Sequence, residues 1–379
     1  MKTPTLLHRR CLAFDAFRGI AALAVCLFHM GDFGFSIIDS AWTSSGKLGV
    51  NLFFTLSGFL ITRSILLPET WSYRRYFESR ARRILPGFYI ALMIVLLLVD
   101  IRIGFTTSSG EFIGNLVAHL TLTHGWFSDY TYSIMGPFWT LSHEWCFYVL
   151  MGLCAVWLRG SMAWTLPVLM LGISIASRQL QYAGVIHLGA GMANPLCLWD
   201  QFAPGILAAL FLFKRDSVPR WFAVAAGLAG TALVSLMLYR YLSVSHEVAA
   251  SGIQGDRHFQ EFSKIFGRSK SNTLYFELFL SLGIAGIVAS LWMIQQRRLD
   301  WLRKTPLLWM GKVSYSTYLY HVPILLTFGH GAKKLSESSL FANPTVTFFI
   351  LMFAFYLFSG FAYRHFEEPW MKRRQNPKS

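Results

Sequence analysis

Two ionisable residues, Arg18 and His29, lie in one apolar segment near the start of the chain, residues 14–33. Ionisable side chains are expensive inside a membrane span and usually have a function there. Eleven helical residues turn by about 1,100°, close to three full turns, so both side chains share one helix face and stand about 16 Å apart in depth. An arginine binds anions and a histidine moves protons, so this face could hold two parts of one substrate. The structural alternatives are a snorkelling arginine and a hydrogen-bonded core histidine.

Two later segments add a carboxylate and a second imidazole. Glu144 lies in GPFWTLSHEWCFYVL, about two helical turns inside an apolar segment, and His321 shares a helix face with Tyr318 in KVSYSTYLYHVPIL. An isolated carboxylate at that depth would cost several kcal/mol, so it must pair, stay protonated or face water. Counted by helical rise, His29, Glu144 and His321 lie at about 6–10 Å from the outer ends of their segments. Two imidazoles and a carboxylate at one level indicate acid–base chemistry, although His321 also fits a hydrogen-bonded core residue.

An arginine-rich segment, SYRRYFESRARRILP, follows the second apolar segment. Guanidinium groups bind phosphate in a bidentate manner, so we predict that Arg80, Arg82 and Arg83 bind the phosphates of a substrate. Anionic lipid headgroups are the alternative ligand. We expect polar and aromatic neighbours to support the site. These are Asn51 and Ser57 in GVNLFFTLSGFLITRS, and Trp139 and Ser142 beside Glu144.

The elements that position these residues are predicted to be membrane-spanning helices. The 379 residues are 54% hydrophobic and only 14% charged, against about 25% charged in soluble domains. Apolar windows long enough to cross a bilayer recur along the chain, which excludes a soluble protein. The expected spans are 14–33, 49–67, 86–104, 137–158, 163–179, 196–213, 219–241, 273–294, 306–328 and 344–364. We therefore predict an all-α, polytopic bundle of about ten spans.

Charge decides the topology. If the apolar stretch 112–126 is re-entrant or interfacial rather than spanning, most Lys and Arg residues fall on the cytoplasmic side, as the positive-inside rule requires. Both termini are then cytoplasmic, with tails 1–13 and 367–379 around a membrane domain 14–366, and 242–272 is an external loop. The net charge of +15 is explained by this distribution rather than by nucleic-acid binding. The five scattered cysteines indicate neither a disulfide framework nor a metal site.

Taken together, these segments resemble the acyltransferase-3 family of membrane-bound O-acyltransferases, which acylate cell-surface glycans and other hydroxyl acceptors. The resemblance runs from Phe14 to Pro369. It rests on the Arg18-x10-His29 pair, GVNLFFTLSGFLI, RARRILP, WTLSHEWCFY, SYSTYLYH and a late EEP, in the order of the family.

The resemblance implies a ten-helix bundle with an acyl-CoA co-substrate, commonly acetyl-CoA, and no permanently bound cofactor. It also implies that His29 and Arg18 are essential and that Glu144 is the matching acid. Many members carry a second acidic residue directly after that Glu; here the position is Trp145, which argues against a carboxylate pair. Some relatives carry an appended extracellular hydrolase-like domain, and we expect this chain to act alone or with a separate partner.

These observations lead to a functional hypothesis for a bacterial inner-membrane enzyme. His29 acts as general base on a hydroxyl of a carbohydrate or lipid-linked glycan, Glu144 orients the imidazole or the acceptor, and Arg18 with the 80–83 arginines holds the CoA phosphates. The main alternative is a transporter of a glycan or small anion, which would usually show internal repeats and broken helices. An intramembrane serine hydrolase using Ser57 is a weaker alternative, because TLSGF lacks the Gly-x-Ser-x-Gly turn.

Overall fold

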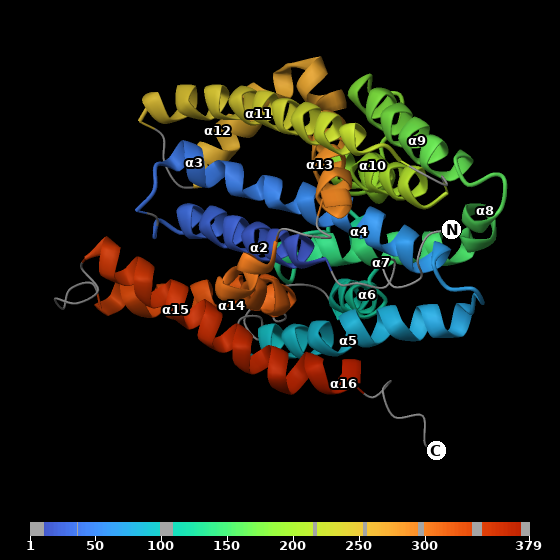
Figure 1. Ribbon diagram of the computed structural model, residues 1–379. Coiled ribbons are helices and arrows are strands. Elements are labelled where there is room, and N and C mark those ends of the chain that lie inside the picture. The colour runs from blue at the N-terminus through green and yellow to red at the C-terminus, as the bar shows by residue number, and fades with distance from the viewer. Residues whose placement is uncertain are drawn as a thin grey trace.

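The computed structural model describes residues 11–35, 37–98, 109–214, 218–252, 256–294, 299–335 and 343–372. Every regular element in these ranges is a helix and none is a strand, which confirms the predicted all-α fold class (Figure 1). The longer helices are α2 (Leu12–Asp32), α4 (Gly49–Leu66), α5 (Tyr73–Leu98), α6 (Ser109–Leu120), α7 (Trp139–Leu153), α9 (Thr165–Tyr182), α10 (Pro195–Phe213), α11 (Arg220–Ala250), α12 (Asp256–Arg268), α13 (Lys270–Ile294), α14 (Leu307–Leu335) and α15 (Pro344–Ala362). Short helical segments are α3 (Ser40–Ser44), η1 (Ser45–Leu48), η2 (His124–Trp126), η3 (Gly136–Phe138), α8 (Ala155–Arg159), η4 (Gly191–Ala193), η5 (Asp300–Lys304), the π-helical η6 (Tyr363–Glu367) and α16 (Glu368–Lys372). Parts of the predicted tails, of the span 86–104 and of the segment 295–305 lie outside the described residues.

Six helices in the described ranges are long and apolar enough to cross a membrane by length and composition, which indicates an integral membrane protein. The remaining predicted spans correspond to α5, α7, α9 and α14, which do not meet the same criterion. Helix α7, for example, has only 15 residues, whereas a full crossing takes about 20. The count of ten spans and the side of the termini stay predictions.

Helices α2 and α14 pack in parallel along a shared seam. Gly19 and Gly311 form its tightest point, where a side chain on Gly311 would run into the backbone carbonyl of Asp15. Small residues allow helix backbones to approach this closely in membrane proteins. Farther along the same two helices, His29 meets His321. Two parallel spans require an odd number of crossings between them, and the ten-span topology, with 112–126 not crossing, meets that requirement.

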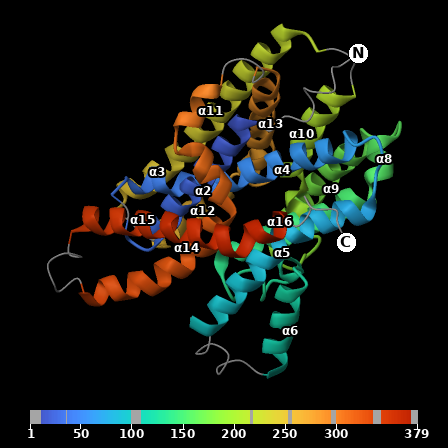
Figure 2. The ribbon, with the colours of Figure 1, turned by 60° about the horizontal axis from the view of Figure 1, so that its bottom comes forward.

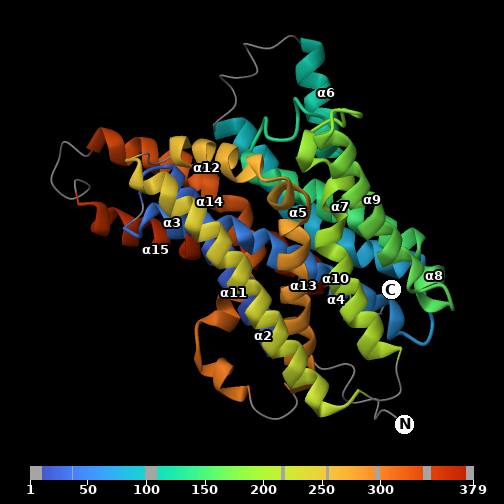
Figure 3. The same ribbon diagram turned by 90° about the horizontal axis from the view of Figure 1, so that it is seen from above.

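A second close crossing joins α4 to α10. Side chains on Gly58 or Gly205 would collide with the opposite backbone, and Thr55 Oγ1 donates a hydrogen bond to Gln201 O across the crossing at 3.0 Å. Helix α9 lies along α10, and α11 lies along α13, on the other side of α4 from α5 and α14 (Figures 1 and 3). The residues around α2 and α4 are therefore enclosed by helices on both sides.

Three segments between or beside the predicted spans have helical structure of their own. The arginine-rich segment after α4, which lies between two predicted spans, forms the first turns of α5, a continuous helix that contains Pro86. The predicted external loop 242–272 is mostly helical, because α11 continues to Ala250 and the amphipathic α12 follows. The stretch 112–126 divides between α6, which stands out from the bundle (Figure 2), and the short η2. In the first two segments the helix continues through polar residues, beyond the apolar run that defines the predicted span.

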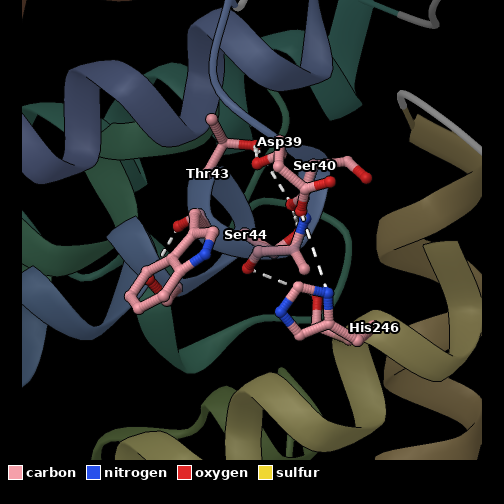
Figure 4. A network of polar contacts seen from close by, with 9 residues as sticks. Asp39, Ser40, Thr43, Ser44 and His246 are labelled. Atoms are coloured by element: carbon pink, nitrogen blue, oxygen red, sulfur yellow. Dashed lines mark hydrogen bonds and ion pairs between the residues drawn. The ribbon is translucent and has the colours of Figure 1, made fainter.

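The end of the bundle near His29 is closed by α3, which packs beside α11. Asp39 caps this helix through Oδ1, which accepts a hydrogen bond from Ala41 N at 2.8 Å. His246 of α11 approaches the same carboxylate, with Nδ1 4.0 Å from Oδ1 (Figure 4). Thr43 and Ser44 donate to backbone carbonyls within the short helix. Local polar contacts thus fix the turn that leads from α2 into α4.

Candidate active site

Two pockets meet inside the bundle, and Val50 and Tyr318 line both of them. We call the first the arginine pocket; its polar walls include Arg18, Ser57, Arg80, Arg83, Glu144 and Tyr148. We call the second the histidine pocket; its polar walls include His29, Asp32, Lys47, Asn51, Gln201 and Glu277. Helix α2 contributes Arg18 to one pocket and His29 to the other.

The protonation of the histidine pair follows from its partners. His321 Nδ1 lies 2.8 Å from Tyr318 O and 3.1 Å from Thr317 O, and a carbonyl only accepts, so we assign the ring hydrogen of neutral His321 to Nδ1. His321 Nε2 is then an acceptor, and it lies 3.1 Å from His29 Nδ1. His29 Nδ1 therefore carries the hydrogen, which also points at Val25 O at 3.0 Å. The lone pair of His29 is left on Nε2, as a general base requires.

Glu144 does not contact His29. Its Oε1 accepts hydrogen bonds from Ser57 Oγ at 3.0 Å and from the hydroxyl of Tyr148, within the arginine pocket. The expectation that Glu144 orients the imidazole therefore has no support in this geometry, because His321 takes that place. The sequence placed the three residues at one depth, but depth alone does not say which helices are neighbours.

The arginines separate into two groups. Arg18, Arg80 and Arg83 line the arginine pocket, whereas Arg82 lies outside it, with NH2 3.9 Å from the carboxylate of Glu78. The guanidinium of Arg80 stands 5.8 Å from the ring of Tyr148, and its buried Nε has no hydrogen-bond partner among the residues that the structure describes. Three guanidinium groups against one carboxylate make this pocket suitable for an anion.

The supporting residues take different roles. Trp139 lines the histidine pocket, and the hydroxyl of Tyr318 donates to Pro137 O at 3.1 Å where the two pockets meet. Ser142 lies apart from both pockets, where it bonds Leu122 O at 2.7 Å and Gly125 N at 3.1 Å and so holds the turn after α6.

His143, which precedes Glu144, is also a structural residue here. Its two ring nitrogens lie 2.7 Å from the carbonyl oxygens of Trp139 and Ala193. Both nitrogens are occupied by backbone contacts, so neither faces a substrate.

Sequence reasoning named Asn51 but missed other polar residues of the histidine pocket, among them Lys47 and Glu277. Asn51 Nδ2 donates to Glu277 Oε2 at 2.5 Å, and the ammonium of Lys47 lies 5.2 Å from the ring centroids of Tyr241 and Phe262. Glu277 falls inside the predicted span 273–294, so the rule that selected His29 should have selected it too.

The same rule selects Asp200, in the predicted span 196–213. Asp200 forms a buried ion pair with Arg178 and a hydrogen bond with Ser174 at 3.2 Å, which joins α10 to α9. Among the described residues, no three His, Cys, Asp or Glu side chains gather as metal ligands would.

Comparisons with known proteins give a consistent result. A family model described as "Acyltransferase domain" matches residues 12–364. The chain is similar to a putative peptidoglycan O-acetyltransferase, YrhL, of Bacillus subtilis, with 26% identity over 84% of this chain and 49% of the relative. It is also similar to the peptidoglycan O-acetyltransferase OatA of Listeria monocytogenes, with 24% identity over 86% of this chain and 51% of the relative. A putative O-acetyltransferase of Staphylococcus aureus is 22% identical over 94% of this chain and 57% of the relative. The chain thus spans about half the length of the curated relatives it matches. No solved structure matches it significantly.

Proposed function

The chain belongs to the acyltransferase-3 family, and from that membership we propose that it is a membrane O-acetyltransferase that moves an acetyl group from acetyl-CoA to a hydroxyl of a glycan. Relatives whose names describe peptidoglycan O-acetyltransferases support this substrate class. The bacterial cytoplasmic membrane is the proposed location, because acetyl-CoA is made inside the cell and the glycan lies beyond it. The proposed partners are acyl-CoA, the glycan and the surrounding lipids.

The observation that carries the proposal is the orientation of His29. Its Nδ1–H is held by His321 and Val25 O, so the lone pair on Nε2 belongs to a residue that lines the histidine pocket. A general base must combine a lone pair in the right place with access to a substrate hydroxyl. His321 serves as a positioning residue, because it acts on the substrate only through His29.

In the proposed reaction, His29 Nε2 takes the proton of the glycan hydroxyl while that oxygen attacks the thioester carbonyl. The tetrahedral intermediate then collapses and breaks the carbon–sulfur bond. The CoA thiolate leaves and takes the proton from the imidazolium of His29, so the products are an acetyl ester and a thiol. His321 Nε2 accepts a hydrogen bond from Nδ1–H throughout and stabilises the imidazolium that forms between the two steps.

The proposed donor site is the arginine pocket. Arg18, Arg80 and Arg83, which line this pocket, would bind the phosphates of CoA, because guanidinium groups match phosphate oxygens in a bidentate manner. The pantetheine arm would run past Tyr318 towards His29. The helical rise puts Arg18 and His29 about 16 Å apart, which suits an extended arm of this kind. Glu144 would balance the charge of the arginines before the donor binds.

The test is acetyl transfer by the purified full-length chain in lipid nanodiscs. With radiolabelled acetyl-CoA and soluble peptidoglycan fragments, we expect base-labile label to appear on the glycan together with stoichiometric free thiol. Thiol release without glycan acetylation would mean that the protein only hydrolyses acetyl-CoA, which contradicts the proposed transfer. If neither product forms with any glycan acceptor while CoA still binds, the proposed transfer is wrong.

A further inference from the structure

One side chain of the histidine pocket has a polar atom that the protein itself does not satisfy. Gln201 is 4% exposed and lines this pocket, and its Oε1 has no hydrogen-bond partner within the described residues. A buried amide oxygen without a donor costs about 1–3 kcal/mol. The backbone of Gln201 is held at the α4–α10 crossing, where its carbonyl accepts from Thr55 Oγ1.

A second acceptor is presented in the same pocket. Asn51, which is 3% exposed, donates its amide to Glu277 Oε2, and the same nitrogen lies 3.5 Å from Ser281 Oγ. These contacts join α4 to α13 and fix the direction of the Glu277 carboxylate. Carboxylate oxygens accept more than one hydrogen bond each, so Glu277 keeps capacity for a ligand hydroxyl while it holds Asn51.

Two aromatic rings stand at the mouth of the pocket. Trp139 and Tyr132 both line it, with their ring centroids 6.2 Å apart and their planes at 62°. Tyr132 is 55% exposed, so its ring is accessible from outside the bundle. The exposed Tyr132 and the half-buried Trp139 together combine a flat apolar face with a polar edge. The apolar C–H face of a sugar ring fits such a surface, while its hydroxyls need acceptors deeper in the pocket.

We infer that the histidine pocket binds one pyranose unit of the glycan acceptor, with Gln201 and Glu277 as the residues that select it. The sugar packs on Trp139 and Tyr132, one hydroxyl donates to Gln201 Oε1, and another donates to Glu277. The hydroxyl to be acetylated then faces His29 Nε2. This assignment rests on the proposed function for its reaction, but the binding site it describes exists without any donor.

Selection by these acceptors has a definite chemical consequence. A pocket built to accept hydrogen bonds from hydroxyls rejects an analogue that lacks them, because Gln201 Oε1 would then stay buried and unpaired. An O-methylated sugar has the same ring and apolar face but no hydroxyl donors. The pocket should therefore bind the sugar more tightly than its O-methylated form, and by more than their difference in shape explains.

Binding of chitotetraose, a neutral oligosaccharide of N-acetylglucosamine, to the full-length protein in nanodiscs tests the inference without acetyl-CoA. We expect the natural chain to bind the oligosaccharide and to bind its O-methylated form at least tenfold more weakly. Gln201→Leu and Glu277→Gln should each weaken chitotetraose binding roughly tenfold. Gln179→Leu is the matched control, because Gln179 lies on α9 and bonds Tyr275 instead. Unchanged binding of free CoA in each variant shows that the bundle is folded.

Each outcome decides the question. If the natural chain does not bind the oligosaccharide, or if both pocket variants bind it like the natural chain, the inference is wrong. Glycan acetylation that continues with an unchanged acceptor KM in both variants would overturn the pocket assignment and leave the proposed function intact. Glycan binding that depends on both residues, in a protein that transfers no acetyl group, would support the pocket and overturn the proposed function.

Discussion

The Nδ1 atom of His29 lies 3.1 Å from the Nε2 atom of His321, and 292 residues separate the two histidines. The same spacing separates Gly19 from Gly311, where α2 and α14 make their closest approach. One parallel register of two helices therefore produces both the glycine contact and the histidine pair. The tautomer of His29, and with it the lone pair on Nε2, depends on helix packing about three turns away.

The first prediction concerns His321. His321→Met should lower kcat by between roughly tenfold and 10⁴-fold with little change in either KM, because the acceptor that fixes the His29 tautomer is lost. His321→Gln keeps an acceptor near the position of Nε2 and should recover part of that loss. Steady-state kinetics with varied donor and varied acceptor separate the two constants. Equal activity of the Met and Gln variants would contradict a role through the hydrogen bond.

The second prediction concerns the base itself. His29→Ala should lower acetyl transfer by about 10²–10⁴-fold, the usual loss when a general base is removed. Protein yield and binding of free CoA should stay near those of the natural chain, since the arginine pocket is lined by other residues. Near-normal turnover by the purified variant would rule out His29 as the base.

The third prediction separates two neighbouring arginines. Arg83→Ala should raise the KM for acetyl-CoA several-fold, whereas Arg82→Ala should have little effect, because only Arg83 lines the pocket. The effect of Arg83→Ala should be larger at low salt than at high salt, since salt screens the attraction that the natural chain gains. Donor titrations at two ionic strengths measure both differences. Similar losses in the two variants would point to a diffuse surface potential instead.

The fourth prediction tests the packing that holds the histidine pair. Gly311→Ala places a methyl group against the backbone carbonyl of Asp15 and should destabilise the protein by about 1–3 kcal/mol while lowering activity. Gly172→Ala is the control: it lies in α9, and among the described residues nothing outside its own stretch of helix comes within 4 Å of the added carbon, so stability should stay level or rise slightly. Thermal unfolding in detergent compares the two. If the Gly311→Ala protein is as stable and active as the natural chain, α2 and α14 can move apart without loss, and the prediction is wrong.

The fifth prediction concerns topology. Single cysteines at Arg74 and Arg303, whose side chains are exposed, should react only with reagents that reach the cytoplasm. A cysteine at Lys264 in α12 should react from outside. The reason is the distribution of Lys and Arg between the two sides. Labelling in intact cells, in a background without the five native cysteines, measures accessibility, and external labelling at Arg303 would exclude the ten-span topology.

The helical class and the membrane setting could be predicted from composition and periodicity alone. Apolar windows of about 20 residues leave the backbone no solution but helices in lipid. The sequence also identified Arg18 and His29 as residues on one face, because helical geometry alone fixes that relation. These conclusions depend only on local periodicity and composition, so they needed no knowledge of neighbouring helices.

The tertiary structure decided which residues meet. Glu144 pairs with Ser57 and Tyr148 rather than with His29, and Arg82 turns away from the pocket that Arg80 and Arg83 line. Gln201 and Glu277 belong to the site only because α10 and α13 pack against α4. Depth in the membrane can be counted along one helix, but lateral contacts follow from how side chains of separate helices interlock. Which helices become neighbours depends on packing residues along the whole chain. The close glycine contacts between helices are the places where this packing is most visible.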